Sequence, residues 1–191
     1  HHKSEAEQTL YQAYAYAQSI AIAHLRAEAL IAIAQTFAEI GAFDRACAAA
    51  AAIDNAPSRA AAFSNVAQAF AKNGIFDQAR AAAEAINDAP YRAAALCDIA
   101  EALIKAGETA QALDLLQLAR TAADVTTSTR AHARALGKVA QGLVQAGAFD
   151  QAHATVEVIS DAYLHAQALI NLVKTFAEVG AFDQAYAVTM A

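Results

Sequence analysis

Apolar residues recur along this chain with the spacing of one face of an α-helix, at relative positions 0, 3, 4 and 7. Five segments share the pattern, and each leads to a glycine. Their apolar residues are Leu30, Ile33, Ala34 and Phe37; Phe63, Val66, Ala67 and Phe70; Leu96, Ile99, Ala100 and Leu103; Leu136, Val139, Ala140 and Leu143; and Leu169, Leu172, Val173 and Phe176. Each segment is predicted to form a helix, called an A helix, that ends at its glycine.

A second helix is predicted after each glycine. The four stretches GAFDRA (41–46), GIFDQA (74–79) and GAFDQA (147–152 and 180–185) begin it, and alanine always stands five residues after the glycine. We expect this B helix to run from the FD pair for about twelve residues, to a region where Pro57 and Pro90 prevent continuation. Each unit is then a helical hairpin, which buries its apolar faces only by stacking on its neighbours.

The glycines set the period of the array. Gly41, Gly74, Gly107, Gly147 and Gly180 are separated by 33, 33, 40 and 33 residues. The predicted array covers residues 4–191 and divides into a half unit at 4–25, units at 26–58, 59–91, 92–131 and 132–164, and a truncated unit at 165–191. Residues 1–3 are interpreted as a tag remnant or leader.

The third unit departs from the others. It reads GETAQA where the others carry FD, and it has seven extra residues, which correspond to two helical turns. These residues are expected to lengthen its B helix or the start of the next A helix.

The units resemble the tetratricopeptide repeat. In one unit the residues that carry the resemblance are Phe63, Val66, Ala67, Phe70, Gly74, Phe76 and Ala79. The period is 33 where the family has about 34, tryptophan is absent, and Leu25, Tyr91 and Leu164 occupy the usual proline column. Ankyrin repeats share the period of 33, but their TPLH-type segment is missing here. The resemblance implies an all-α fold, a right-handed α-solenoid of stacked helical hairpins with about eleven helices.

Composition and charge exclude several partner classes. The chain is 58% hydrophobic, largely through alanine, and has 2 prolines and no tryptophan, which favours closely packed helices over strands. A net charge of −6 disfavours nucleic acid, because phosphate contacts need clustered Lys and Arg. No apolar run is long enough to span a membrane. The isolated residues Cys47 and Cys97 form no disulfide framework and favour a cytoplasmic location.

Neither catalysis nor metal binding is indicated by the repeated FD motif. A phosphate loop needs several glycines and a nearby lysine, and each joint has one glycine and no lysine beside it. Asp44, Asp77, Asp150 and Asp183 lie one repeat apart and are not expected to converge. A structural role is favoured instead, with glycine in the left-handed conformation and aspartate at the positive end of the B helix. We expect no catalytic residue, no cofactor and no metal site, since the histidines lack ligand spacing.

A basic column stands fifteen residues before the glycines. It consists of Arg26, Arg59, Arg92, His132 and His165. Helical phase directs it toward the preceding B helix, so we expect bonds to the last carbonyls of that helix and to Asp54, Asp88 and Asp161. The less favoured alternative is a ligand-binding ladder.

Partner binding is expected on the opposite face of the A helices, because the resemblance implies a concave groove there. Arg130, Arg134 and Lys138 recur every four residues on this face, and Lys174 of the next unit is expected beside them. Asp98 and Glu101 adjoin the patch and give the groove two signs of charge. The candidate groove residues are Arg130, Arg134, Lys138, Gln141, Asn171, Lys174, Asp98, Glu101, Asn65 and Gln68. A solvated charged face beside an insertion is the alternative interpretation.

The sequence therefore predicts a non-enzymatic scaffold that binds a protein or peptide partner, and we hypothesise that this partner is acidic. Two alternatives stay open. The chain could be a sensor or regulatory module of a larger signalling protein or enzyme. It could also assemble end to end as a homo-oligomer, because neither end of the array carries a polar cap.

Overall fold

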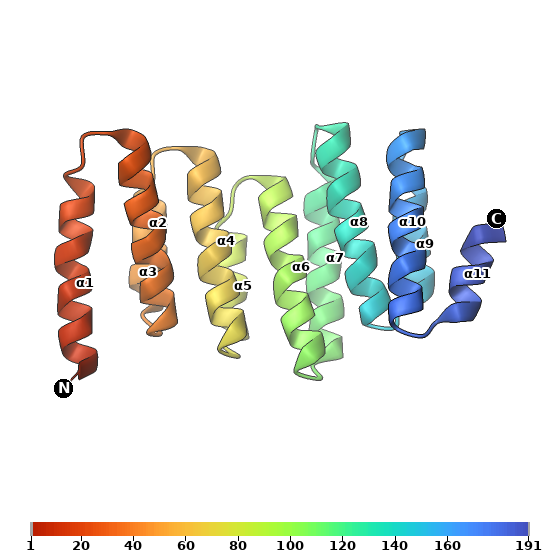
Figure 1. The fold of residues 1–191 in the computed structure, drawn as a ribbon, viewed down its shortest axis with the longest axis horizontal. Coiled ribbons are helices and arrows are strands. Elements are labelled where there is room, and N and C mark those ends of the chain that lie inside the picture. Colours follow the sequence, from red (N-terminus) through yellow and green to blue (C-terminus); the bar gives the residue numbers. More distant parts are fainter. Residues whose placement is uncertain (1, 191) are drawn as a thin grey trace. The chain divides into compact units, whose positions relative to one another are not determined.

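The computed structural model describes the backbone of residues 2–190 and the side chains of residues 7–189. The backbone of 2–190 forms eleven helices and no strand, which confirms the all-α class (Figure 1). The chain divides into two compact units, the N-terminal unit up to Ala95 and the C-terminal unit from Leu96 onward. Each unit is a row of helical hairpins, the arrangement that the tetratricopeptide-like pattern predicts.

The helices alternate in length as the two halves of each repeat. The A helices are 17 residues long: α2 (Ala23–Glu39), α4 (Ala56–Lys72), α6 (Ala89–Lys105), α8 (Thr129–Gln145) and α10 (Ala162–Glu178). The B helices are α1 (His2–Gln18), α3 (Phe43–Ala51), α5 (Phe76–Glu84), α7 (Thr109–Asp124), α9 (Phe149–Glu157) and α11 (Phe182–Met190). Four B helices, α3, α5, α9 and α11, have nine residues, fewer than the twelve or so expected from the sequence.

Side-chain caps mark where the A helices begin, except in α2, whose N-cap residue Ile22 makes no side-chain hydrogen bond. Asn55 Oδ1 accepts a hydrogen bond from the Ser58 amide, and Asp161 Oδ1 accepts one from the Leu164 amide. Both bonds satisfy amides that have no partner inside the helix. Pro57 lies in the first turn of α4, where its missing N–H costs nothing. The proline therefore favours the start of an A helix, and α3 already ends at Ala51.

The glycine joints have the backbone geometry that the sequence predicts. All five joint glycines have positive φ, between 74° and 85°. At the first joint the Gly41 amide donates to the Ala38 carbonyl, and the Ala42 amide donates to the Phe37 carbonyl. These bonds satisfy the last carbonyls of α2 and stop the helix. Asp44 follows in the first turn of α3, where the helix dipole favours an anion. The motif is a scaffold joint.

The phenylalanine of the FD pair joins successive hairpins. The ring of Phe43 packs edge-on against Phe70 of α4, with centroids 5.4 Å apart. Phe149 makes the same contact with Phe176 of α10 at 5.5 Å. Such edge-to-face pairs add to the free energy gained from burial. The FD motif therefore fixes both the start of its own B helix and the position of the next A helix.

The seven extra residues of the third unit lie in its B helix. Helix α7 has 16 residues where α9 has nine, whereas α8 keeps the usual 17. Leu116 of α7 sits against Gly142 of α8, and a Cβ atom at Gly142 would lie 2.6 Å from Leu116 Cδ2. Glycine at this position therefore lets the two helices approach closely.

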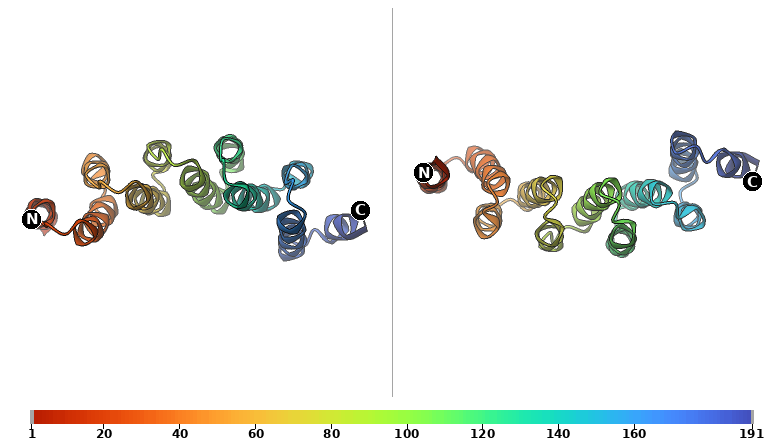
Figure 2. Two further views of the ribbon diagram at one scale, coloured as in Figure 1. Left: turned by 90° about the horizontal axis from the view of Figure 1, so that it is seen from above. Right: turned by 90° about the horizontal axis from the view of Figure 1, so that it is seen from below.

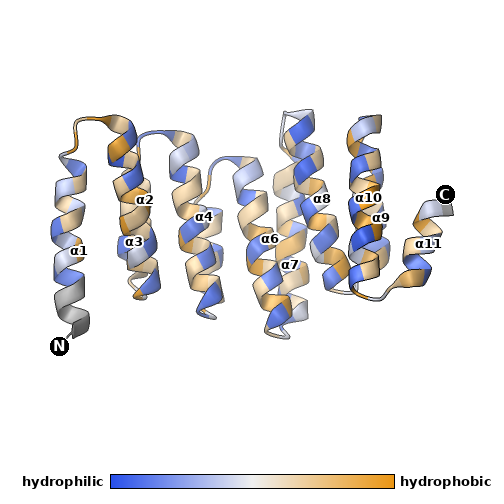
Figure 3. Cartoon of the chain, viewed as in Figure 1, coloured by the Kyte–Doolittle hydropathy of each residue, from blue (hydrophilic) through white to orange (hydrophobic). Residues whose placement is uncertain are grey.

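The core of each unit lies between its A and B helices. In the view along the helices, α3 and α5 lie on one side of the row formed by α2 and α4, and α7 and α9 lie likewise beside α8 and α10 (Figure 2). Apolar and polar residues share each A helix (Figure 3). Alanines such as Ala46, Ala50 and Ala152 are fully buried at these contacts. The faces of the A helices that point away from the B helices carry the polar residues of the candidate binding surface.

Candidate functional site

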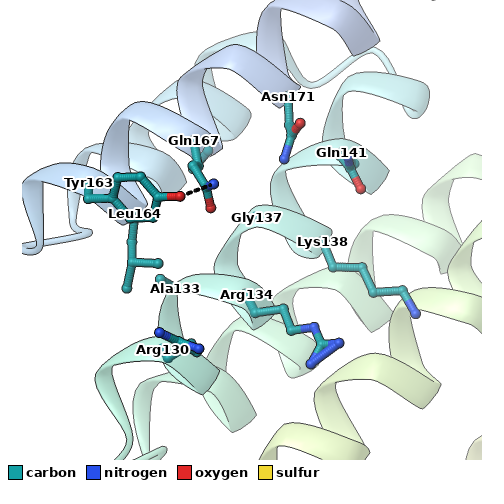
Figure 4. Close-up of a pocket in the computed structure, with 11 residues that line it drawn as sticks. Arg130, Ala133, Arg134, Gly137, Lys138, Gln141, Tyr163, Leu164, Gln167 and Asn171 are labelled. Atoms are coloured by element: carbon teal, nitrogen blue, oxygen red, sulfur yellow. Dashed lines mark hydrogen bonds between the residues drawn. The ribbon is translucent and has the colours of Figure 1, made fainter.

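A groove of about 590 Å³ runs between α8 and α10 in the C-terminal unit, and it is called the α8–α10 groove below (Figure 4). Its lining residues are Arg130, Ala133, Arg134, Gly137, Lys138, Gln141, Tyr163, Leu164, Gln167, Ala168 and Asn171. The small residues Ala133, Gly137 and Ala168 are part of this lining. The groove therefore has room for a chain between its polar walls.

Two arginines give the α8 wall its positive charge. Arg130 and Arg134 are exposed, and their guanidinium groups have no ion-pair or hydrogen-bond partner among residues 7–189. They stand one helical turn apart, so their side chains share one face of α8. An arginine with exposed, unoccupied donors can bind a carboxylate through two parallel hydrogen bonds.

Lys138 has a different situation from the two arginines. Its Nζ atom forms an ion pair with Asp98 Oδ1 of α6, at 2.5 Å. Its side chain extends away from Tyr163 and Gln167 of the opposite wall (Figure 4). The charge of the half-exposed Lys138 is therefore offset by Asp98, and the net positive charge of the groove comes from Arg130 and Arg134.

The α10 wall combines an aromatic ring, an apolar side chain and amides. The Tyr163 side chain is 70% exposed, and its hydroxyl accepts a hydrogen bond from Gln167 Nε2 at 2.9 Å (Figure 4). Leu164 lies next to it in the lining, and Asn171 stands two turns further along α10 than Leu164. Apolar surface is thus concentrated at one end of this wall, and hydrogen-bonding amides are spread along it.

The structure brings together five of the candidate residues identified in the sequence. Arg130, Arg134, Lys138, Gln141 and Asn171 all line the α8–α10 groove. The other candidates lie elsewhere. Lys174 is exposed on α10 outside the lining, Glu101 pairs with Lys105 at 2.6 Å, and Asp98 holds Lys138. Asn65 and Gln68 belong to the N-terminal unit, where they line a separate pocket of about 140 Å³ with Gln35, Glu39, Ala69, Lys72 and Asn73.

Sequence reasoning missed the α10 residues Tyr163, Leu164, Gln167 and Ala168. Gln167 stands two residues after the basic column, a position that helical phase places on the groove face, so this residue carried a usable signal. Tyr163 carried the same signal, because it lies four residues before Gln167 on the same face of the helix, although the unit was expected to begin at residue 165. Helix α10 begins at Ala162 and includes both residues.

The N-terminal unit has a groove of about 570 Å³ at the same register of the repeat. It is lined by residues of α2 and of the segment from Ile53 to Ser58. His24 and Glu28 stand in it where Arg130 and Arg134 stand in the α8–α10 groove, counted from the glycine of each unit. These two positions of the repeat therefore carry different charges in the two grooves.

The basic column is a structural feature of the hairpins. Arg26, Arg59 and Arg92 each donate through Nη1 to a carbonyl at the end of the preceding B helix. The acceptors are Ile20, Ile53 and Ile86, at 2.7, 2.9 and 3.1 Å. These bonds confirm the predicted role at the helix end for the three arginines of the column.

The carboxylates predicted to bind the basic column have other partners in the structure. Asp54 pairs with Arg26 at the start of its own unit, at 2.8 Å, and not with Arg59 of the next unit. Asp88 and Asp161 cap the A helices that follow them. His165 Nε2 is buried without a hydrogen bond, 3.5 Å from Glu157 Oε1. The prediction failed because a side chain at a helix start can turn toward the amides of its own helix or toward another helix.

The thiols show no sign of chemical activation. The pKa of Cys97 is raised to about 12, mainly by burial, while Lys138 lowers it and Asp98 raises it to smaller extents. Burial and the nearby Asp44 carboxylate raise the pKa of Cys47 to about 11. A thiol in this state is protonated at neutral pH and is a poor nucleophile. Within the residues whose side chains are described, no three His, Cys, Asp or Glu residues cluster as metal ligands would.

Among the described helices, none combines the length and the apolar character needed to cross a membrane.

Comparisons with known proteins supply a structural neighbour and no family. No family model matches the chain, and no curated protein matches it. One similar solved structure contains nearly identical TPR-like repeats of a Podosopora anserina protein named as a kinesin light chain. It is 16% identical, and the match covers 86% of this chain and 92% of that one with a TM-score of 0.49.

Proposed function

We propose that this chain is a non-catalytic interaction module that binds an acidic segment of a partner protein in the α8–α10 groove. One observation carries the proposal. Arg130 and Arg134 expose unpartnered guanidinium groups, among the described residues, on the wall of a groove of about 590 Å³. The protein as a whole carries a net charge of −6, so a local excess of positive charge must be built by specific residues.

The polar walls suit the backbone of an extended segment. Gln141 on α8 and Gln167 and Asn171 on α10 offer amide donors and acceptors to the groove. A bound chain in an extended conformation leaves its own N–H and C=O groups unsatisfied, and such amides can pair with them. The arginines select for acidic side chains in the bound segment. The amides bind its backbone and so add affinity that does not depend on its sequence.

The ion pair between Lys138 and Asp98 leaves the two arginines as the groups that select an acidic segment. Asp98 holds the Lys138 ammonium group at the edge of the lining, so a partner meets two arginines there and no acidic side chain. The corresponding groove of the N-terminal unit presents Glu28 and would repel an acidic segment. The proposal therefore assigns binding to the C-terminal unit.

A fluorescence anisotropy titration tests the proposal. The probe is a fluorescein-labelled oligoglutamate peptide, and a glycine–serine peptide of equal length is the neutral control. The test variant is Arg130→Gln/Arg134→Gln. The matched control is Arg80→Gln/Arg120→Gln, which removes two positive charges from B helices outside the groove.

The two variants are expected to differ clearly in their affinity for oligoglutamate. Loss of two charge-assisted contacts should weaken oligoglutamate binding by at least about tenfold in the test variant. The matched control should change it about twofold or less, because distant exposed charges are screened by salt. Equal losses in both variants, or equal affinity of the wild type for the two peptides, would overturn the proposal.

Self-association is a second candidate function, favoured by an exposed aromatic face on α11. Phe182 is 68% exposed and Tyr186 is 66% exposed. Phe43 and Phe149, the equivalents of Phe182, pack against the next A helix. A second copy of the chain could cover this face in the same way. Light scattering after size exclusion tests it, with Phe182→Ser as the variant. A dimer that dissociates in the variant supports the candidate, and a monomer at all concentrations contradicts it.

A further inference from the structure

We infer that the α8–α10 groove recognises acidic side chains at alternate positions of an extended segment, an acidic–any–acidic pattern. The inference rests on the proposed function and names the sequence pattern that this function selects. It follows from the spacing of two side chains on one wall and from the chemistry of the other wall.

The spacing of the two arginines sets the pattern. Arg130 and Arg134 are one turn apart on α8, so their attachment points are separated by about 6 Å along the helix axis. Side chains on one face of an extended chain recur every second residue, about 6.6 Å apart. Alternate acidic residues of a segment that runs along α8 therefore reach the two guanidinium groups together. Adjacent acidic residues cannot, because successive side chains point to opposite faces.

The opposite wall, formed by α10, disfavours an acidic side chain at the position between the two acidic residues. The residue between the two acidic positions faces α10, where the Tyr163 ring and the Leu164 side chain form the lining. An acidic side chain placed there would lose hydration without gaining a cationic partner. An apolar side chain would gain by contact with the same surface. The two walls therefore select different residues at alternating positions.

The width of the groove favours an extended chain over a helix. Neighbouring packed helices such as α8 and α10 have axes about 8–10 Å apart. A helix with its side chains is about 10–12 Å across and would not enter the space between their side chains. A helical partner could still lie on top of the groove and offer acidic residues four positions apart. The spacing of the acidic residues distinguishes the two arrangements experimentally.

The test uses three labelled peptides of identical composition and charge. The first reads Gly-Ser-Ala-Glu-Leu-Glu-Ala-Ser-Gly, with its C-terminus amidated, and has alternate glutamates. The second, Gly-Ser-Ala-Leu-Glu-Glu-Ala-Ser-Gly, has adjacent glutamates. The third, Gly-Ser-Glu-Ala-Leu-Ala-Glu-Ser-Gly, has the spacing of a helical turn. Each is titrated by anisotropy with the wild type, with Arg130→Gln/Arg134→Gln and with the control Arg80→Gln/Arg120→Gln. The folded state of each variant is checked by circular dichroism.

The wild type should bind the alternate isomer about tenfold more tightly than either of the others, because only this isomer engages both arginines. The preference should vanish in the groove variant and persist in the control. Double-mutant cycles compare each arginine with each glutamate of the alternate isomer. Each arginine should show a coupling energy with one of the two glutamates only. That result also gives the direction of the bound segment.

Three outcomes overturn the inference. If all isomers bind equally and all are weakened in the groove variant, the proposed function stands and the spacing rule is wrong. If the third isomer binds best, the partner is helical and the rule is again wrong. If oligoglutamate and all three isomers fail to bind, both the proposed function and the inference are wrong.

Discussion

Lys138 of α8 and Asp98 of α6 form an ion pair at 2.5 Å, so one of the groove cations expected from the sequence is already paired with a carboxylate of a neighbouring helix. Sequence periodicity places Lys138 in one row with Arg130 and Arg134. The structure distinguishes it from them, because its ammonium group pairs with Asp98 of α6 while the two guanidinium groups have no such partner among residues 7–189. The pair therefore sets how much positive charge a partner meets.

Neutralising Asp98 should strengthen the binding of an acidic peptide. In Asp98→Asn the groove edge loses one negative charge, and Lys138 becomes available to the partner. We expect the affinity for oligoglutamate to rise about threefold at low salt and less at high salt, as a charge about 10 Å away would predict. Anisotropy titrations at two salt concentrations measure this. Asp114→Asn on α7 is the matched control, and an equal gain there would show that only net charge matters.

Two glycines of α8 should respond in opposite ways to alanine. Gly137 has open space around the position of a Cβ atom, so Gly137→Ala should raise the free energy of unfolding by about 0.5–1 kcal/mol through helix propensity. In Gly142→Ala the new methyl group meets Leu116, and overpacking should cost about 1–3 kcal/mol, which outweighs the same propensity gain. Urea denaturation midpoints compare the two variants. Equal stabilisation of both would contradict the close approach of α7 and α8.

Local features of the fold could be predicted from the sequence, and contacts between distant residues could not. The glycine that ends an A helix and the aspartate that begins a B helix act within a few residues, so their spacing identifies them. The pairs Arg26–Asp54 and Lys138–Asp98 join residues 28 and 40 positions apart and depend on the side-chain direction of both partners. The sequence also left open where the seven extra residues lie, since either helix can absorb two turns, and packing places them in α7.

Replacing His165 by arginine should stabilise the C-terminal unit. Arg26, Arg59 and Arg92 each donate to the carbonyl six residues earlier, and Ile159 occupies that position before His165. The buried Nε2 atom of His165 makes no hydrogen bond. In His165→Arg a new bond to the Ile159 carbonyl should add about 1 kcal/mol to the free energy of unfolding.

The reverse exchange serves as the control for that prediction. Arg59→His removes the bond to the Ile53 carbonyl and should cost about 1 kcal/mol. Both variants are measured by urea denaturation. A destabilised His165→Arg variant would show that the histidine position is already optimal and that the column has no common role.

The thiols of Cys47 and Cys97 should titrate at pH values well above the ordinary range of a cysteine side chain. Burial, assisted by Asp44, raises the pKa of Cys47 from 9.0 to about 11, so its thiolate is about 100-fold scarcer than that of a free thiol near pH 8. Alkylation of native Cys47 by iodoacetamide should therefore keep accelerating as the pH rises from 9 to about 11. Mass spectrometry of the labelled peptide locates the reaction. A rate that levels off near pH 9 would contradict the shift.

The same shifts predict how stability depends on alkaline pH. A thiol whose pKa is raised in the folded state favours folding fully only below the pKa of the unfolded chain. For Cys97, with a folded pKa of about 12, stability should fall as the pH rises from about 9 toward 12. The pH dependence of the urea midpoint measures this loss, and a Cys97→Ala variant should show less of it. An identical alkaline slope in both proteins would exclude a contribution from this thiol.

The central claim is that Arg130 and Arg134 bind acidic side chains in the α8–α10 groove, and the most direct measurement observes their guanidinium groups. The Nε–H resonances of the arginines are followed by NMR while oligoglutamate is added to the full chain. The account predicts that the signals of Arg130 and Arg134 shift in a saturable manner, whereas those of Arg80 and Arg120 stay in place. Unmoved Arg130 and Arg134 signals, or a uniform shift of all arginines, would contradict it.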